Sequence, residues 1–258
     1  MISPHAWPAE EAAINGFPPL RQVVLGDWLL RFSGGVRRTA NSVTPLREPQ
    51  GDPRGDLDEV IAIAETLYGA QRQPTIFRIP SFLDPAIDAG LAARGYTAEG
   101  ESCIIEGPFD PIIAAAAPFG GVDAVHLEDQ PTEGWFAAMA RLQGQRPEFH
   151  AGYREIVSSV VLPATFAELA IGGAAVALAY GTVHRGMLCF ESVVTDARHR
   201  RKGYSRRILA ALAGWAKQQG ATIATLQVEA HNTPGRALYH SIGMTTELHR
   251  YHYRRAPS

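Results

Sequence analysis

Apolar residues recur along this chain with two different spacings, one typical of strands and the other of helices. Runs rich in β-branched and aromatic residues predict strands, whereas apolar residues spaced three or four apart predict helices. The predicted strands cover residues 28–32, 75–79, 102–106, 123–127, 164–172, 175–184, 187–194, 222–229 and 247–254. The predicted helices cover residues 56–68, 84–94, 135–142, 149–157, 208–216 and 233–243. This mixture of hairpins and strand–helix–strand segments predicts the α+β class with mixed sheets.

The segment after the strand at 187–194 carries the clearest chemical signal. Its apolar run ends at Thr195-Asp196, and a basic loop centred on Gly203 precedes the next helix. Unpaired N–H groups and the helix dipole make such a helix N-terminus a binding site for anions, and a glycine allows close approach of the backbone. Positive charges are added by Arg200, Arg201, Lys202, Arg206 and Arg207. We therefore predict a pyrophosphate site.

The spacing of this loop resembles the acyl-coenzyme A signature of the GNAT superfamily of N-acyltransferases, Arg/Gln-x-x-Gly-x-Gly/Ala. Here the motif is Arg200-x-x-Gly203-x-Ser205, with Ser205 where glycine or alanine is usual. Loops of the forms Gly-x-x-x-x-Gly-Lys-Ser/Thr and Gly-x-Gly-x-x-Gly do not occur in the chain, so the common nucleotide motifs offer no competing interpretation.

A second motif follows the strand at 222–229. Thr233 is predicted as a helix N-cap, Pro234 favours the first helical position, and Gly243 favours the C-terminal cap. The segment resembles the GNAT pattern Asn-x-x-x-x-Ala-x-x-Tyr-x-x-x-Gly-Phe, with one residue fewer before the alanine and Met in place of Phe. The matching residues are Asn232, Ala237, Leu238, Tyr239 and Gly243. The resemblance covers residues 122–254 in full and the first hundred only in outline.

The resemblance implies transfer of an acetyl group from acetyl-CoA to a primary amine by direct attack in a ternary complex. A phenol with an ordinary pKa of about 10 stays protonated while a thiol near 8.5 ionises, so Tyr239 is the expected general acid. Glu191, on the strand beside the acyl group, is the expected base. The backbone N–H around Val194 is expected to polarise the thioester carbonyl.

The expected cofactor-binding residues lie at the end of this strand, in the basic loop and before the second motif. They are Val193, Val194, Thr195, Arg200, Arg201, Lys202, Gly203, Tyr204, Ser205, Arg206 and Asn232. The acceptor is expected to be a small molecule, an amino acid or a peptide. In the superfamily the helices at 135–142 and 149–157 line the acceptor site, so Trp135, Phe149, Tyr153 and Arg154 are candidate contacts.

Each of these residues has a simpler interpretation. Tyr239 packs its ring on a helix face, Glu191 is an exposed strand residue, and the basic loop is solvated or binds nucleic acid. A net charge of −2, with no second basic stripe, disfavours nucleic acid as a partner. Histidines are scattered, and neither His-x-x-x-His nor Cys-x-x-Cys occurs, so no metal site is predicted. A non-catalytic acyl-CoA sensor or interaction scaffold stays open as an alternative.

The first hundred residues resemble a degenerate copy of the second half. Ser42 lies 53 residues before Gly95, and Ser192 lies 51 before Gly243. The position of the tyrosine holds Leu91, and the segment 47–56, where the phosphate loop belongs, contains two prolines and three acidic residues. Prolines remove N–H donors and carboxylates repel phosphate, so this copy is expected to bind no coenzyme A.

We therefore predict two GNAT-like mixed-sheet domains. Residues 1–108 form the degenerate domain, 109–121 a linker rich in proline, glycine and alanine, and 122–258 the catalytic domain with the full acyl-CoA site.

Composition agrees with an intracellular enzyme, and the cytoplasm is the expected location. Cys103 and Cys189 are the only cysteines, so no disulfide framework is indicated. The N-terminus lacks the pattern of a signal peptide, and the longest uncharged apolar stretches fall short of the ~20 residues that span a membrane. No membrane partner is expected, and a homodimer is compatible with these properties.

Overall fold

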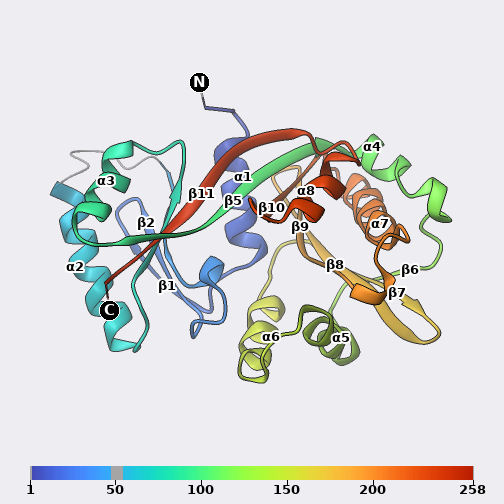
Figure 1. Cartoon of the computed structure of the whole chain (residues 1–258), viewed down its shortest axis with the longest axis horizontal. Coiled ribbons are helices and arrows are strands. Elements are labelled where there is room, and N and C mark those ends of the chain that lie inside the picture. Colours follow the sequence, from blue (N-terminus) through green and yellow to red (C-terminus); the bar gives the residue numbers. More distant parts are fainter. Residues whose placement is uncertain (1, 48–54, 258) are drawn as a thin grey trace.

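In the described residues, the strands of the computed structural model form one sheet (Figure 1). The structure describes residues 2–47 and 55–257. The eleven strands lie in the order β1-β2-β3-β4-β11-β5-β10-β9-β8-β7-β6. Their bounds are β1 Arg21–Leu25, β2 Trp28–Phe32, β3 Val43–Pro45, β4 Ile76–Pro80, β5 Thr97–Pro108, β6 Val125–Glu128, β7 Ala164–Ile171, β8 Ala174–His184, β9 Met187–Thr195, β10 Ile223–Glu229 and β11 Thr246–Arg255.

The helices pack on both faces of this sheet (Figure 1). Their bounds are α1 Ala6–Gly16, α2 Gly55–Ala70, α3 Pro85–Ala93, α4 Phe109–Ala114, α5 Glu133–Gln143, α6 His150–Ser158, α7 Tyr204–Gln218 and α8 Thr233–His240. Short 3₁₀ turns η1 to η4 lie at Arg38–Ala40, Ala117–Phe119, Pro147–Phe149 and Ala197–His199. In the described part of the chain, no helix has both the length and the apolar character needed to cross a membrane.

The strand order is nearly symmetric about the central pair of β11 and β5, which are the last strands of the second and first halves. β4 of the first half flanks this pair on one side, and β10 of the second half flanks it on the other. β11 pairs with β4, and β5 pairs with β10, so each half donates its last strand to the other. The sequence predicted two mixed-sheet domains. The structure instead joins all strands into one mixed sheet, because β5 and β11 also pair with each other.

β8 shows how the period-2 pattern separates the two faces. Ala177 and Ala179 belong to the core beneath α7 and α4, whereas Leu178 and Tyr180 belong to the core beneath α5 and α6. Successive side chains of a strand point to opposite faces, so one apolar run serves both cores. The predicted hairpin at 164–184 is found as β7 and β8.

Part of the predicted linker is an ordered component of the core. Residues 109–121 contain α4 and η2, and Phe109 and Ile112 are buried against the residues of α7. Lys217 of α7 donates to Asp110 over 3.0 Å. The domain limits at 108 and 122 stay a prediction.

Helix α1, which the apolar pattern did not predict, crosses behind the junction of the two halves. Its Glu10 is buried and accepts hydrogen bonds from both Nη atoms of Arg78 on β4. His249 Nε2 of β11 lies 2.6 Å from Glu10 Oε1. Burial on its own raises the pKa of Glu10, but Arg78 and His249 hold it below its ordinary value. The carboxylate therefore stays charged and links α1 to β4 and β11.

Removing Arg78 is expected to destabilise the protein strongly. Arg78→Met leaves the buried Glu10 carboxylate with His249 as its remaining hydrogen-bond partner, and breaking a buried ion pair costs about 3–5 kcal/mol. Urea unfolding near neutral pH measures the loss. The control is Arg94→Met, which breaks an exposed pair with Asp58 and is expected to cost less than about 1 kcal/mol. Equal losses in both variants would contradict this role of Glu10.

Candidate functional site

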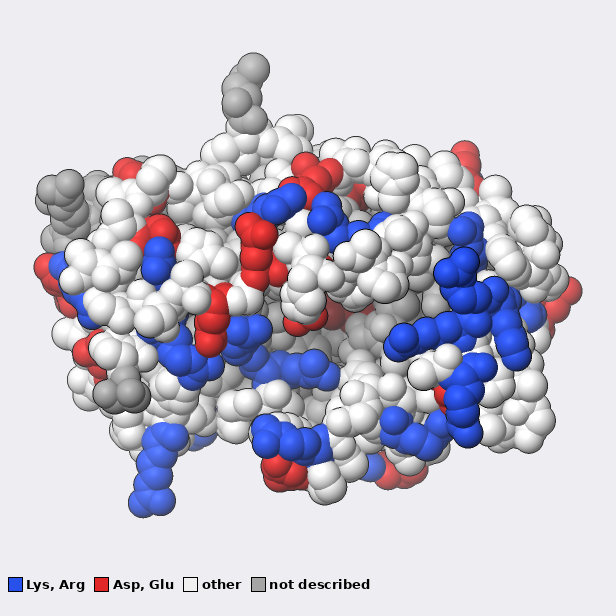
Figure 2. Space-filling view, in the orientation of Figure 1, with Lys and Arg blue, Asp and Glu red and all other residues white. Residues whose placement is uncertain are grey.

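A cleft opens where two parallel strands separate. β9 and β10 pair from Met187 and Ile223 as far as Phe190 and Leu226, and no pairing continues beyond. A cavity of about 670 Å³ lies past this point, and its lining includes residues 190–193 of β9 and 226–229 of β10. Figure 2 shows the hollow in the middle of this face.

A β-bulge in β9 shapes the wall of this cleft. The pairing of β9 with β8 shifts between Glu191 and Val194, so Ser192 and Val193 have no partner on β8. Ser192 has a φ of +54°, in the left-handed region that a residue other than glycine adopts rarely. The Tyr153 hydroxyl of α6 donates to Ser192 Oγ over 2.7 Å. The bulge is therefore held in place from α6.

Glu191 lies on β9 immediately before the bulge. Its carboxylate is half-buried, and Cys189 Sγ donates to Oε1 over 3.4 Å. The end of α1 covers it, since a Cβ on Gly16 would lie 3.4 Å from Oε1. Burial raises the pKa of Glu191 to about 7, against the opposing effects of the Cys189 hydrogen bond and of nearby arginines. Glu191 therefore titrates near neutral pH.

Tyr239 lines the same cleft from α8. The residue is 8% exposed, and among the described residues none accepts a hydrogen bond from its hydroxyl. Burial, followed by the charge of Glu191, raises the pKa of Tyr239 to about 12. The phenol is therefore neutral at physiological pH and available as a donor.

Asn232 is the N-cap of α8, and the predicted cap at Thr233 was wrong by one residue. Asn232 Oδ1 accepts from the Gly235 N–H over 3.0 Å, and the residue also lines the cleft. The side-chain oxygen is thus engaged in ordering the helix that carries Tyr239. Pro234 lies in the first turn but at the second helical position, one residue later than predicted.

The basic loop forms the turn between β9 and α7. Arg201 has φ +65° and Gly203, the N-cap, has φ +78°, so two left-handed residues direct the backbone into the helix. A Cβ at Gly203 would lie 2.1 Å from Phe119 Cγ, which is a second reason for glycine there. Ser205 Oγ lies 2.6 Å from Thr195 Oγ1, which ties the helix start to the strand end.

The positively charged side chains of this loop differ in whether they form hydrogen bonds within the protein. Arg200, Arg201 and Lys202 are exposed, whereas Arg206 donates to Ser241 Oγ and Arg207 to the Gly121 carbonyl, each over 2.8 Å. Figure 2 shows Lys and Arg side chains gathered over the right-hand part of this face, where Figure 1 places α7. The loop presents cations beside a helix N-terminus, which is the chemistry of an anion site.

The predicted site residues fall into two adjoining groups. Glu191, Val193, Asn232 and Tyr239 line the cleft. Val194, Thr195 and residues 200–206 lie outside its lining, along the path from the end of β9 into α7.

The four candidate acceptor contacts also divide. Phe149 and Tyr153 line the cleft. Trp135 is buried in the core, where its indole N–H donates to the Ala167 carbonyl over 3.3 Å. Arg154 lies outside the lining, pairs with Glu133 and lies over the Phe136 ring. The helical periodicity alone did not separate the positions that line the cleft from those that do not.

The sequence left open whether the first half forms a wall of the acceptor cleft, and it identified none of the residues that do so. Arg37, Arg38 and Thr39 line it, together with Ser102 of β5 and Arg255 of β11. The available signal was the basic pair that follows the Gly34-Gly35 turn, but nothing in the sequence placed it beside Glu191.

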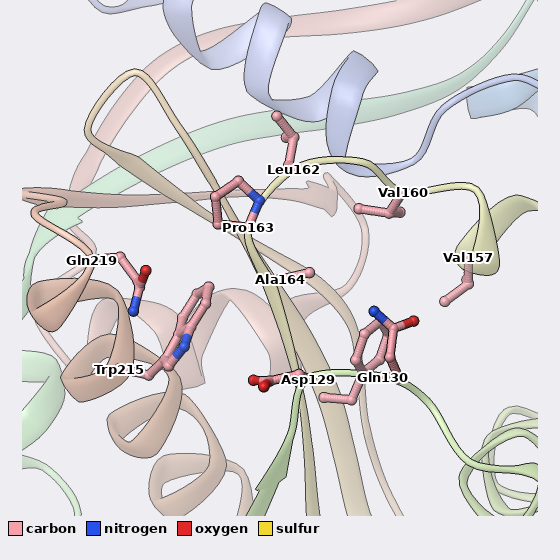
Figure 3. Close-up of a pocket in the computed structure, with 10 residues that line it drawn as sticks. Asp129, Gln130, Val157, Val160, Leu162, Pro163, Ala164, Trp215 and Gln219 are labelled. Atoms are coloured by element: carbon pink, nitrogen blue, oxygen red, sulfur yellow. The ribbon is translucent and has the colours of Figure 1, made fainter.

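A second cavity lies apart from these residues. It has a volume of about 400 Å³, and Figure 3 shows Trp215 and Gln219 on one side and Val157, Val160 and Gln130 on the other. Trp215 and Gln219 belong to the C-terminal end of α7, opposite to Gly203. The cavity shares no lining residue with the cleft. Among the residues that the structure describes, no cluster of three or more His, Cys, Asp or Glu side chains is placed to hold a metal ion.

The comparisons with known proteins agree with this geometry. A family model described as "Probable histone acetyltransferase Rv0428c C-terminal" matches residues 8–254. The protein described as "Uncharacterized N-acetyltransferase YobR" of Bacillus subtilis (strain 168) is 29% identical over 246 residues, which cover 95% of this chain and 96% of YobR. A GCN5-related N-acetyltransferase from Kribbella flavida superposes with a TM-score of 0.72 at 18% identity, covering 98% of this chain and 96% of that one.

A tandem GNAT protein from the clavulanic acid biosynthesis pathway has the same fold, with a TM-score of 0.65 at 15% identity over 97% of this chain and 88% of that one. The GNAT resemblance read from the two sequence motifs is thereby confirmed. The chain belongs to the Rv0428c C-terminal acetyltransferase family and is an acyl-CoA-dependent acetyltransferase of the GNAT type.

Proposed function

We propose that this enzyme transfers an acetyl group from acetyl-CoA to a primary amine, with Glu191 as the base and Tyr239 as the donor to the leaving thiolate. One observation carries the proposal. Glu191, with a pKa raised to about 7, and Tyr239, held neutral, line a single cleft where β9 and β10 separate.

The role of Glu191 follows from the chemistry of the amine. A primary amine is mostly protonated at neutral pH, with a pKa of about 10 for a lysine-like group, and only the neutral form attacks a thioester. A carboxylate that titrates near the working pH removes a proton effectively, directly or through a water molecule. The burial that raises the pKa of Glu191 therefore supports this role.

The role of Tyr239 is set by its raised pKa. The pKa of the Tyr239 phenol, about 12, lies above the pKa of a thiol, about 8.5, so complete transfer of the phenol proton to a free thiolate is unfavourable. Its contribution is a hydrogen bond to the sulfur as charge develops there. Backbone N–H groups of the bulge around Val193 and Val194 supply the corresponding stabilisation at the carbonyl oxygen.

Direct transfer, without a covalent enzyme intermediate, is supported by the state of Cys189. The thiol is fully buried, and burial raises its pKa well above the ordinary value. A thiol that does not ionise is a poor nucleophile. Its contact with Glu191 is therefore assigned to orientation of the carboxylate.

The cofactor site is assigned to the turn between β9 and α7. The left-handed residues Arg201 and Gly203 and the N-terminus of a 15-residue helix fit a pyrophosphate, and the nearest acid, Asp196, is engaged by Arg198. Bound there, the cofactor supplies the activated acetyl group. Ser205 fits the site although glycine or alanine is usual, since its hydroxyl is engaged by Thr195.

We assign the first half to a degenerate copy of the second. The mirrored strand order, with β5 and β11 exchanged, supports this assignment. The corresponding loop at 47–56 lies almost wholly outside the described residues, so its loss of the phosphate site rests on the sequence. A cytoplasmic location is supported by Cys103 and Cys189, which are both free thiols.

Binding of acetyl-CoA is expected to depend on Gly203. Calorimetric titration of the wild type is expected to show one site per chain with micromolar affinity, about 8 kcal/mol. Gly203→Glu places an anion in the proposed cradle and is expected to weaken binding at least tenfold. Gly220→Glu, at φ +80° and with open space around it, controls for the backbone strain and is expected to bind normally. Gly203→Gln meets the Phe119 ring equally without adding charge, so the difference in affinity between Gly203→Glu and Gly203→Gln measures the effect of the anion. Two sites per chain would contradict the assignment of the first half.

The rate is expected to rise with pH through about 7 as Glu191 loses its proton. Glu191→Gln is expected to lower kcat by about 10²–10⁴-fold and to remove this limb of the pH profile. Coenzyme A release, followed from pH 5.5 to 9, measures both effects. The control is Glu168→Gln, at a half-buried position of β7, and this variant is expected to keep the wild-type profile.

A stability measurement checks the same carboxylate without relying on activity. Because the pKa of Glu191 is raised from 4.5 to about 7, ionisation is disfavoured in the folded protein. The free energy of unfolding therefore falls as pH rises between these values. Glu191→Gln removes the fall and is expected to be more stable than wild type at pH 8 by about 1–3 kcal/mol, but not at pH 4. No gain at pH 8 would rule out the raised pKa.

Tyr239→Phe is expected to lower kcat by about 10²-fold or more while coenzyme A still binds. The ring is kept, so packing in the core is preserved and only the hydroxyl is lost. Single-turnover measurements of coenzyme A release, beside calorimetric binding, separate the two effects. Unchanged turnover would remove Tyr239 from the mechanism. Binding of coenzyme A without turnover of any amine, even in the wild type, would favour the acyl-CoA sensor.

A further inference from the structure

The charges along the cleft are unequal. Arg37, Arg38, Arg146 and Arg255 line it, against the carboxylates of Glu191 and Glu229. Figure 2 shows Lys and Arg side chains on both sides of the hollow. All four arginines lie outside the helices that the sequence assigned to the acceptor site. Three of them, Arg37, Arg38 and Arg255, come from the first half and β11, which build most of this basic wall.

Three of these arginines are paired with carboxylates within the protein. Arg38 and Arg255 share the carboxylate of Glu99, at 3.1 and 3.0 Å. Arg146 lies 3.4 Å from Glu148. The cluster of Arg38, Arg255 and Glu99 keeps one net positive charge, but the hydrogen-bonding groups of these arginines are already engaged with carboxylates.

Arg37 is different. In the ranges 2–47 and 55–257 no carboxylate lies within ion-pair distance of it, and its recorded partner is the neutral Gln143 Oε1, at 2.7 Å. Arg37 also acts on the interior of the cleft, because its charge lowers the pKa values of Glu191 and Tyr153 against the raising effect of burial. An unpaired guanidinium thus lies within electrostatic reach of the proposed base.

Tyr253 gives an independent observation at the same wall. The residue lines the cleft and is 3% exposed, yet its buried hydroxyl makes no hydrogen bond with any described residue. Arg38 lies 4.7 Å above its ring. A buried hydroxyl without a partner costs free energy, and an anionic oxygen in the cleft would accept its hydrogen bond.

We infer that the acceptor is an amine that also carries an anionic group, with the amine at Glu191 and the anion at Arg37 and Tyr253. The inference rests on the proposed function and names its substrate class. A carboxylate and a phosphate share the chemistry that a guanidinium recognises. A lysine-rich peptide does not fit, since its neighbouring cations meet the basic wall.

The test is a comparison of matched acceptors. Amino acids and amino phosphates of increasing chain length are each assayed beside the corresponding uncharged amide or alcohol, together with a lysine-rich peptide, by release of coenzyme A. We expect kcat/KM to be at least tenfold higher for the anionic member of a pair. The carboxylate and phosphate series distinguish the two sources of the anion.

The variant Arg37→Gln is expected to reduce this preference about tenfold or more, the range for a hydrogen bond to a charged group. Arg21→Gln is the matched control, because Arg21 likewise donates to a glutamine Oε1, that of Gln71 over 2.9 Å, but lies on edge strand β1 away from the cleft. It is expected to keep the wild-type preference. Calorimetric affinity for coenzyme A, measured on the same samples, checks that the variants are folded.

Three outcomes would overturn the inference while leaving the proposed function intact. They are equal or better turnover of the uncharged members, equal or better turnover of the lysine-rich peptide, and an unchanged preference in Arg37→Gln. Absence of coenzyme A binding, or turnover of no amine of either kind, would overturn the proposed function and this inference with it.

Discussion

The antiparallel pairing of β5 with β11 is the constraint on which the rest of the structure depends. These two strands are the last of their halves, and each also pairs with a strand of the other half. An interior strand satisfies its backbone N–H and C=O groups by pairing with a neighbour on each side. Because β5 and β11 pair with each other and each also pairs with a strand of the other half, the two halves form one continuous sheet. The buried carboxylate of Glu10 reinforces the same junction by binding Arg78 and His249.

The exchange also decides what lines the cleft. β11 brings Tyr251, Tyr253 and Arg255 to a cavity whose other wall is β9, and the loop after β2 adds Arg37 and Arg38. The wall of the cleft that faces β9 is therefore built from both halves of the sequence, with Arg37 and Arg38 from the first half and β11 from the second.

The environment of Glu191 illustrates how the fold tunes chemistry. The bulge at Ser192 interrupts the pairing of β9, and the end of α1 covers the carboxylate, so a group that is ordinarily ionised titrates near neutrality. The same burial keeps the Tyr239 phenol neutral. Both pKa values are raised by the same main cause, desolvation; in the proposed mechanism Glu191 then acts as a base and Tyr239 as a donor.

The sequence by itself determined the local elements and the position of the glycine-containing turn between β9 and α7. Strand and helix periods are local, so most predicted segments appear within a few residues of their bounds, and Gly203 and the second motif identified the family. The Ala-rich helix α1 was missed because it is apolar on most of its surface and shows no clear amphipathic period.

Only the tertiary structure decided the rest. Strand exchange between halves leaves no local signal, because β5 and β11 have the same pattern whether they pair within a half or across halves. The raised pKa of Glu191 and the unpaired charge of Arg37 likewise depend on residues more than a hundred positions away. Pairing and burial are properties of the assembled chain, whereas propensity and turn chemistry are properties of a few neighbouring residues.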